Sequence, residues 1–175
     1  MSDLGQRLLD ASYLEGDFVL RSGRRSKFYL DKYLFSTQPD LLRDIAAGLA
    51  EKLPAHEPFD VLAGPELGAV AIVAAVSLAY GKPFLIVRKG EKGYGTSKAL
   101  EGHAVPGQRV VMIEDVVTSG GAAIMATQRL REAGLDVPVL LCVVDREEGG
   151  REQIETQKLA FDSLFTATSL GIKKA

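Results

Sequence analysis

The sequence is poor in the residues that mark disulfide-linked and zinc-binding proteins. Its 175 residues include one cysteine, Cys142, so an internal disulfide is excluded. The thiol lies in an apolar run, where we expect it to be buried, and a lone cysteine fits a reducing compartment. The two histidines, His56 and His103, have no other metal-type ligand nearby, which argues against a zinc site and favours surface positions.

Long apolar runs and strong net charge are also missing. The longest unbroken apolar run, residues 69–76, is far shorter than the about 20 residues that cross a bilayer. The first residues, Met1 to Leu4, carry neither a basic nor a long apolar stretch, so we expect no signal peptide and a cytoplasmic protein. A net charge of −2 and a pI near 5.7 give no whole-chain case for binding nucleic acid or an anionic membrane, but they do not exclude a local basic patch.

Two common nucleotide-binding motifs are absent as well. No G-x-G-x-x-G follows the first strand and no G-x-x-x-x-G-K-[S/T] occurs, which argues against dinucleotide and P-loop sites. No repeat or Pro/Ser-rich linker divides the chain, and 46% hydrophobic and 25% charged residues are ordinary for a globular domain. We therefore expect one domain over residues 1–175.

The pattern of apolar residues predicts strands that alternate with helices. Strands are expected at residues 18–20, 28–30, 61–63, 84–87, 110–113 and 137–144, with a final strand or turn at 161–165. Helices are expected at residues 4–14, 39–53, 67–80, 122–133 and 150–157. This alternation predicts an α/β fold with a doubly wound parallel sheet flanked by helices. The first helix and hairpin, residues 1–36, would form a small hood beside it.

The most informative segment runs from Val110 to Gly121. An apolar strand is followed by the adjacent acids Glu114 and Asp115, and then by the small residues Thr118–Gly121 before a helix. Open α/β sheets bind ligands at the carboxyl ends of strands, where such acids can accept hydrogen bonds from ribose hydroxyls. A helix N-terminus with free N–H groups suits a phosphate. The alternative is an ordinary strand–helix turn with solvated acids and side-chain capping of the helix.

Positive charge gathers in the expected mobile loop, residues 88–102. Its first eleven residues hold three glycines and four cations, a composition that does not pack into a core. Arg88, Lys89 and Lys92 could close over a departing pyrophosphate and stabilise its negative charge. The alternative is a solvated charged loop. The turn at residues 64–68 could bring backbone N–H groups to a pyrophosphate, or be a plain strand–helix turn.

Arg146 follows the end of the expected strand at residues 137–144. A guanidinium there could bind a planar carboxylate through two hydrogen bonds. Alternatively, Arg146 pairs with its neighbours Asp145 and Glu147.

Residues 110–121 resemble the signature with which type I phosphoribosyltransferases bind 5-phosphoribosyl 1-pyrophosphate (PRPP). With the blocks at residues 18–23, 88–96 and 145–147, most of the chain resembles an orotate phosphoribosyltransferase. The resemblance implies an enzyme that transfers the phosphoribosyl group from PRPP to N1 of orotate, giving orotidine 5-phosphate and pyrophosphate in pyrimidine biosynthesis. It also implies Mg²⁺ carried by PRPP, near Glu114 and Asp115, and a homodimer without nucleic-acid or membrane partners.

The same resemblance implies roles for individual residues. Lys92, Arg88 and Asp115 are implied as catalytic. Orotate contacts are implied for Tyr29, Leu30, Thr118 and Arg146. PRPP contacts are implied for Arg21, Arg88, Lys89, Lys92, Tyr94, Glu114, Asp115, Val116, Val117, Thr118, Ser119, Gly120, Gly121 and Ala122. In a dimer, Arg88 and Lys92 would serve the partner's site and Lys89 its own.

The sequence departs from the family pattern at a few positions. Tyr94 stands where some members have histidine, and Gly68 lies near the place where some have lysine, so a direct pyrophosphate contact there is lost. Glu114 stands where aspartate is common. The signature alone does not separate orotate from a purine or another pyrimidine, and a PRPP-sensing regulator that binds nucleic acid without catalysis is a further alternative. The Arg146 block and the hood favour orotate.

Overall fold

The computed structural model describes residues 3–19, 25–53, 58–90 and 99–172 of the chain. Its helices are α1 (Asp3–Ser12), α2 (Lys32–Ser36), α3 (Pro39–Glu51), α4 (Val70–Tyr80), α5 (Gly121–Glu132) and α6 (Gly150–Thr156). Its strands are β1 (Tyr13–Val19), β2 (Arg25–Leu30), β3 (Val61–Pro65), β4 (Phe84–Val87), β5 (Leu100–Glu101), β6 (Arg109–Val117), β7 (Asp136–Asp145) and β8 (Ala160–Thr166). In these ranges no helix has the length and apolar character needed to cross a membrane.

The main sheet has six strands in the order β5-β4-β3-β6-β7-β8. Strands β4, β3, β6, β7 and β8 run parallel, and β5 pairs antiparallel with β4. The chain goes from β3 to β4 and then returns to place β6 on the other side of β3, so the direction of winding reverses between β3 and β6. Ligands of open α/β sheets bind beyond the carboxyl ends of the strands at such a reversal. The doubly wound sheet predicted from the sequence is confirmed.

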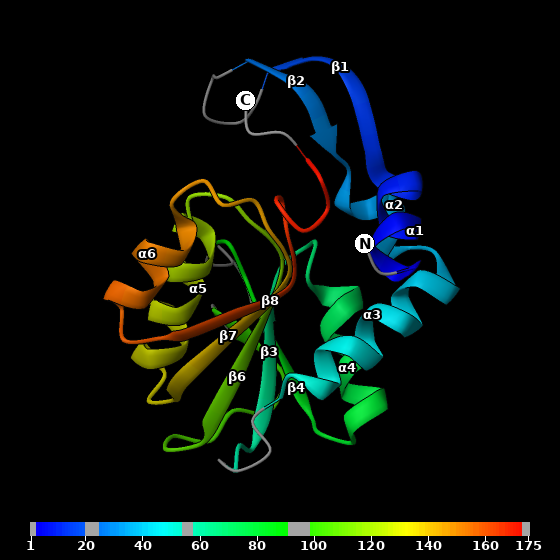
Figure 1. Cartoon of the computed structure of the whole chain (residues 1–175). Coiled ribbons are helices and arrows are strands. Elements are labelled where there is room, and N and C mark those ends of the chain that lie inside the picture. The colour runs from blue at the N-terminus through cyan, green and yellow to red at the C-terminus, as the bar shows by residue number, and fades with distance from the viewer. Residues whose placement is uncertain (1–2, 20–24, 54–57, 91–98, 173–175) are drawn as a thin grey trace.

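The central strands are buried on both faces, as parallel sheets usually are. Successive side chains point to opposite faces, so Val111 and Ile113 of β6 pack with α3 and α4, while Val110 and Met112 pack with α5 and α6. Figure 1 shows these two pairs of helices on opposite sides of the sheet. The free thiol of Cys142 is buried in the layer beneath α5 and α6, as expected.

The N-terminal segment forms a separate two-stranded antiparallel sheet, β1–β2, which lies above the main sheet in Figure 1. The rings of Tyr13 and Phe28 stack at 5.6 Å between the two strands. The backbone N–H of Asp31 donates to the carbonyl of Ser12 at 2.9 Å, which ties the end of β2 to the end of α1. Asp31 then caps α2 by accepting from the N–H of Tyr33. The segment predicted to form the hood therefore contains α2 in addition to the predicted helix and hairpin.

Several predicted boundaries are wrong in instructive ways. Residues 13–14 belong to β1 and not to the first helix, because they pair with Tyr29 and Leu30 of β2. Helix α4 begins at Val70, since residues 66–69 form a turn. Part of the segment expected to be a loop forms β5, and α2 was not predicted. Strand β6 continues to Val117, so both acids of the signature lie within the strand.

Candidate active site

The carboxyl ends of β6 and β7 and the end of the hood enclose a cavity of about 710 Å³. From the hood come Tyr29, Leu30 and Lys32. From the main domain come Glu114, Val116, Val117, Thr118, Ser119, Gly120, Gly121, Ala122, Ala123, Met125, Arg146 and Glu148. The sequence analysis pointed to most of these residues, and the fold brings its two expected regions, the signature and Arg146, to the walls of one cavity.

The N-terminus of α5 opens directly onto this cavity. Gly120 is its N-cap residue, with φ of 79°, and no side chain caps the helix. A Cβ at Gly120 would also lie 3.1 Å from the carbonyl oxygen of Gly150, so glycine is required there for two reasons. The idea that Thr118 or Ser119 merely caps the helix is therefore wrong. The first N–H groups of α5 are oriented for an anion by the helix itself.

The acids of the signature are buried, which contradicts the alternative of solvated acids. Glu114 is 6% exposed and Asp115 is 2% exposed. Since they are neighbours in a strand, their side chains leave β6 in opposite directions. Glu114 lines the cavity, whereas Asp115 lies against the turn that follows β3, at Gly68. The two carboxylates are nevertheless close enough to interact, and the ammonium of Lys32 experiences the charge of both.

Lys32, which was not predicted from the sequence, supplies the counter-charge to Asp115. Its Nζ lies 2.6 Å from Oδ2 of Asp115. Burial alone would lower the pKa of Lys32, but the charge of Asp115, its hydrogen bond and the charge of Glu114 outweigh that effect and raise the pKa. The ammonium therefore stays charged at neutral pH. Its position in the sequence could have indicated a role in the site, because Lys32 lies two residues after Leu30, which was expected to contact the base.

Burial raises the pKa of Glu114 well above the ordinary value of 4.5, and the negative charge of Asp115 raises it further. The folded protein therefore holds this proton more tightly than the unfolded chain does. The stability that this proton contributes is fully present below pH 4.5 and is lost as the pH rises through the folded-state pKa. Ionising Glu114 in the folded protein is therefore a cost to folding that a bound ligand could offset.

We expect Glu114→Gln to stabilise the ligand-free protein, because glutamine fills the same space without an ionisable group. The gain in the free energy of unfolding should be about 1 kcal/mol at neutral pH and should grow as the pH rises from acid. Urea unfolding over a pH series measures it, with Glu132→Gln on the exposed surface of α5 as control. A difference from wild type that stays constant across the series would contradict the assignment.

Arg146 forms the wall of the cavity nearest the hood. Its side chain is 8% exposed, its guanidinium carbon lies 4.6 Å from the ring centroid of Phe28, and Nη2 lies 2.8 Å from Oε1 of Glu148. The expected alternative partners are engaged elsewhere: Asp145 accepts from the N–H of Glu147, and the Glu147 carboxylate accepts from the N–H of Thr168. Arg146 is thus a buried cation on an aromatic surface, with Glu148 as its ion-pair partner.

The loop cations Arg88 and Lys89 lie outside the cavity lining. Nη1 of Arg88 is 3.5 Å from Oε1 of Glu101 and 3.9 Å from Oε2 of Glu66. The backbone of Lys89 is held at both ends, by its N–H to Glu66 and by its carbonyl to Arg129 of α5. Three other expected PRPP contacts, Arg21, Lys92 and Tyr94, lie outside the described residues.

Comparisons with known proteins agree with this geometry. The family model described as "Phosphoribosyl transferase domain" matches residues 37–165. The orotate phosphoribosyltransferase of Methanocella arvoryzae is 46% identical over 155 residues, covering 89% of this chain and 87% of that protein. The chain belongs to the orotate phosphoribosyltransferase family. It is thus a transferase, and the resemblance stated from the sequence is confirmed.

Solved structures of orotate phosphoribosyltransferases share the fold along nearly the whole chain. The enzyme from Aeropyrum pernix is 31% identical, with a TM-score of 0.86 and coverage of 95% of both chains. The enzyme from Mycobacterium tuberculosis H37Rv, solved in complex with PRPP, is 30% identical, with a TM-score of 0.81 and coverage of 97% of both chains.

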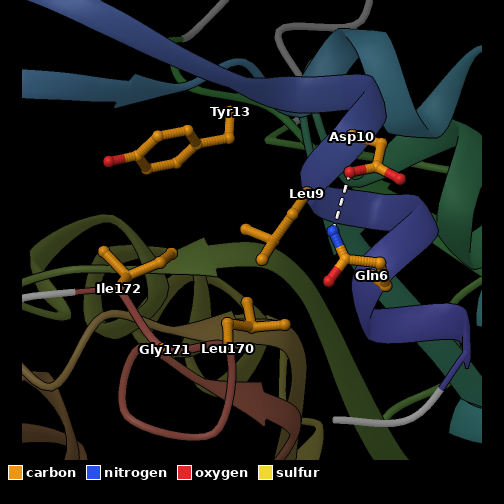
Figure 2. A pocket seen from close by; sticks show the side chains of 7 residues that line it. All are labelled: Gln6, Leu9, Asp10, Tyr13, Leu170, Gly171 and Ile172. Carbon is orange, nitrogen blue, oxygen red and sulfur yellow. Dashed lines mark hydrogen bonds between the residues drawn. The ribbon is translucent and has the colours of Figure 1, made fainter.

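A second cavity, of about 380 Å³, lies between α1 and the C-terminal turn. Figure 2 shows Gln6, Leu9 and Asp10 of α1 facing Tyr13 and residues 170–172 across it. The amide of Gln6 donates to Asp10 at 2.7 Å. Among the described residues, none of the predicted orotate phosphoribosyltransferase site residues lines this cavity, so the carboxyl edge of the sheet remains the candidate active site.

Proposed function

We propose that the protein transfers the 5-phosphoribosyl group of PRPP to N1 of orotate. One observation carries the proposal: a single cavity has a buried guanidinium on one wall, an uncapped helix N-terminus on another and a buried carboxylate between them. These three groups match the carboxylate of orotate, the 5-phosphate of PRPP and the ribose hydroxyls. The names of the relatives point to the same reaction.

The 5-phosphate would occupy the N-terminus of α5, where the backbone N–H groups of Gly121 and Ala122 and the hydroxyls of Thr118 and Ser119 can donate to its oxygens. Glu114 and Asp115 would accept hydrogen bonds from the ribose hydroxyls. This places C1 of the ribose in the crevice between β3 and β6, with Val116 and Val117 as the floor beneath the sugar.

Orotate would lie between the hood and the end of β7. Its carboxylate would receive two N–H donors from Arg146, whose guanidinium already lies over the ring of Phe28. Tyr29 and Leu30 would cover the ring, and Thr118 would reach it from the opposite wall. Glu148, the partner of Arg146, would share the guanidinium with the base.

The reaction breaks the bond between C1 and the pyrophosphate oxygen and forms a bond from C1 to N1 of orotate, whose proton is released. The leaving pyrophosphate keeps the electron pair. Cations that contact it more strongly as its charge develops lower the barrier to the reaction. Arg88, Lys89 and Lys92 are the proposed contributors. No nucleophile from the protein is needed, because the two substrates react directly when they are aligned.

Mg²⁺ is the proposed metal partner of PRPP. The carboxylates of Glu114 and Asp115 are hard oxygen ligands of the kind that Mg²⁺ prefers, and their burial beside a ligand cavity fits an ion that is shared with substrate oxygens. In the described ranges no three His, Cys, Asp or Glu side chains form a metal-binding group, so most ligands would come from PRPP and water. Bound to the diphosphate, the ion would neutralise part of the leaving group's charge.

A homodimer is proposed from the character of α4. This helix is apolar along most of its length, and Ala71, Ala74 and Leu78 share a face at helical spacing, while Leu67 lies in the turn that precedes the helix. Leu67 is 65% and Leu78 is 88% exposed, which leaves an apolar surface suited to a second copy of the chain. In such a dimer Arg88, which does not line the cavity of its own chain, would act on the partner's site. A cytoplasmic location stays a prediction.

A spectrophotometric assay tests the proposed reaction. With PRPP and Mg²⁺ present, the absorbance of orotate should fall, and uracil, hypoxanthine and xanthine should give no reaction. Turnover of a purine or of uracil would identify a phosphoribosyltransferase of different base specificity. Binding of PRPP without consumption of any base would favour the regulatory alternative.

We expect Arg146→Ala to raise the KM for orotate by roughly 30- to 100-fold, the size of a lost charge-assisted contact. The KM for PRPP should change little, since Arg146 faces the base. Arg146→Lys should recover part of the loss but not the geometry of two parallel hydrogen bonds. Steady-state kinetics with each substrate varied in turn measure both constants, and an unchanged KM for orotate would remove Arg146 from base recognition.

A further inference from the structure

We propose that Lys32 is a substrate-binding residue whose ammonium contacts the diphosphate of PRPP at the turn after β3. The inference rests on the proposed function and adds a cation from the hood to the diphosphate side of the same site. It is carried by three observations: the ion pair with Asp115, the place of Lys32 in the cavity wall, and the space left by Gly68.

The fold fixes the backbone of Lys32 before any ligand arrives. Lys32 is the first residue of α2, and Figure 1 shows this helix at the base of the β1–β2 sheet. The preceding residue, Asp31, is bound on both sides, by its N–H to the carbonyl of Ser12 and by its carboxylate to the N–H of Tyr33. The side chain therefore starts from an anchored point and reaches down to the main sheet.

The ammonium has a buried side and an open side. On the buried side it meets Asp115, which is 2% exposed, while the side chain of Lys32 is 31% exposed and lines the cavity. An ammonium carries three N–H donors, so an acceptor in the cavity can be bound without breaking the contact with Asp115. Lys32 can thus bind Asp115 and a ligand at the same time.

Gly68 makes room for this arrangement. A Cβ at residue 68 would lie 1.6 Å from Oδ2 of Asp115 and 2.7 Å from Nζ of Lys32. A side chain at residue 68 is therefore incompatible with the ion pair. The turn itself brings no cation to the crevice, and Lys32 delivers one to the same place from another part of the chain.

The position of Lys32 selects the diphosphate and not the 5-phosphate. Its ammonium adjoins the turn after β3, and in that turn Glu66 accepts a hydrogen bond from the backbone N–H of Lys89, the clamp residue proposed for the same site. The N-terminus of α5 lies on the other side of β6, where Gly120 packs on Gly150 of α6. A ribose bound between them points C1 and its leaving group toward Lys32.

Calorimetry with three ligands tests the proposal: PRPP, inorganic pyrophosphate and ribose 5-phosphate. In Lys32→Met we expect the Kd of PRPP and of pyrophosphate to rise about tenfold or more and that of ribose 5-phosphate to change less than about twofold. Lys32→Arg should keep most of the affinity. Lys27→Met is the matched control, because Lys27 is a lysine of the same hood that pairs with Asp17 and lies outside the cavity lining. Equal losses for all three ligands, or no loss, would overturn the proposal.

A second pair of variants separates contact with the ligand from charge balance at Asp115. Asp115→Asn removes the buried carboxylate, so adding Lys32→Met leaves no uncompensated charge that would prevent folding. On that background the pyrophosphate Kd should still rise about tenfold. No change there would mean that Lys32 acts only through Asp115, and the proposal would be wrong. Wild-type protein that binds neither PRPP nor pyrophosphate would overturn both the Lys32 proposal and the proposed function. Wild-type protein that binds PRPP and pyrophosphate but does not turn over orotate would overturn only the assignment of orotate as the base, and the Lys32 proposal would stand.

Discussion

Gly68→Ala is expected to reduce kcat/KM for PRPP about 100-fold, a large effect for one methyl group. The added Cβ would lie 1.6 Å from Oδ2 of Asp115, far inside the distance at which two unbonded atoms can approach. The carboxylate and the ammonium of Lys32 must then move apart, and a buried ion pair that loses its geometry costs stability as well as function. We also expect the free energy of unfolding to fall by about 1–3 kcal/mol.

Gly48→Ala is the control for this substitution. Gly48 lies in α3, where an added Cβ would meet only the flexible end of Leu164, at 3.1 Å, and where alanine favours the helix. We expect that variant to keep wild-type kinetics. Steady-state kinetics with PRPP varied and urea unfolding of both variants provide the comparison. If Gly68→Ala kept a kcat/KM within about threefold of wild type, the position of the Asp115 carboxylate would not matter for the reaction. The proposed contact of Asp115 with PRPP would then be wrong.

Lys92→Ala is expected to lower kcat by about 100- to 1,000-fold, the usual size of losing one group that stabilises developing charge. The Kd and KM of orotate should stay close to wild type, because the clamp acts on the leaving group and not on the base. Single-turnover and steady-state measurements separate the two. A near-normal kcat would remove Lys92 from the mechanism.

Mixing two impaired variants, assayed near the wild-type KM for orotate where Arg146→Ala turns over little substrate, tests whether Lys92 acts across the proposed dimer. Lys92→Ala and Arg146→Ala damage different parts of the site, so a mixed dimer regains one complete site only if the loop of one subunit serves the other. After random reassociation, about a quarter of wild-type activity should return. If the loop serves its own subunit, no activity returns, and the homodimer with shared sites would lose its main support.

The sheet and most helices could be predicted because their signals are local. The apolar runs that became β6 and β7 carry the pattern of strands covered on both faces, and Pro39 marks the start of α3 as expected. The region of the site followed from the same logic, because parallel strands end at a common edge. Arg146 and residues 118–121 were found in this way.

The parts that sequence reasoning missed depend on contacts between distant segments. Residues 13–14 fit the apolar pattern of the first helix, but pairing with β2 draws them into a strand. The ion pair between Lys32 and Asp115 joins the hood to the central strand, and no local pattern reveals such a pair. The ion-pair partner of Arg146 was also missed. Asp145 and Glu147 are closer in sequence, but their carboxylates accept hydrogen bonds from backbone N–H groups, and Arg146 pairs with Glu148.

The junction between β2 and α2 links recognition of the base to departure of the leaving group. Tyr29 and Leu30, the proposed covers of orotate, and Lys32, the proposed ligand of the diphosphate, stand on one short continuous stretch fastened at Asp31. Any displacement of the hood would therefore move Tyr29, Leu30 and Lys32 together. Efforts to re-engineer the enzyme for a different nucleobase by exchanging hood residues will therefore alter turnover along with selectivity, unless the lysine is brought back to the same spot.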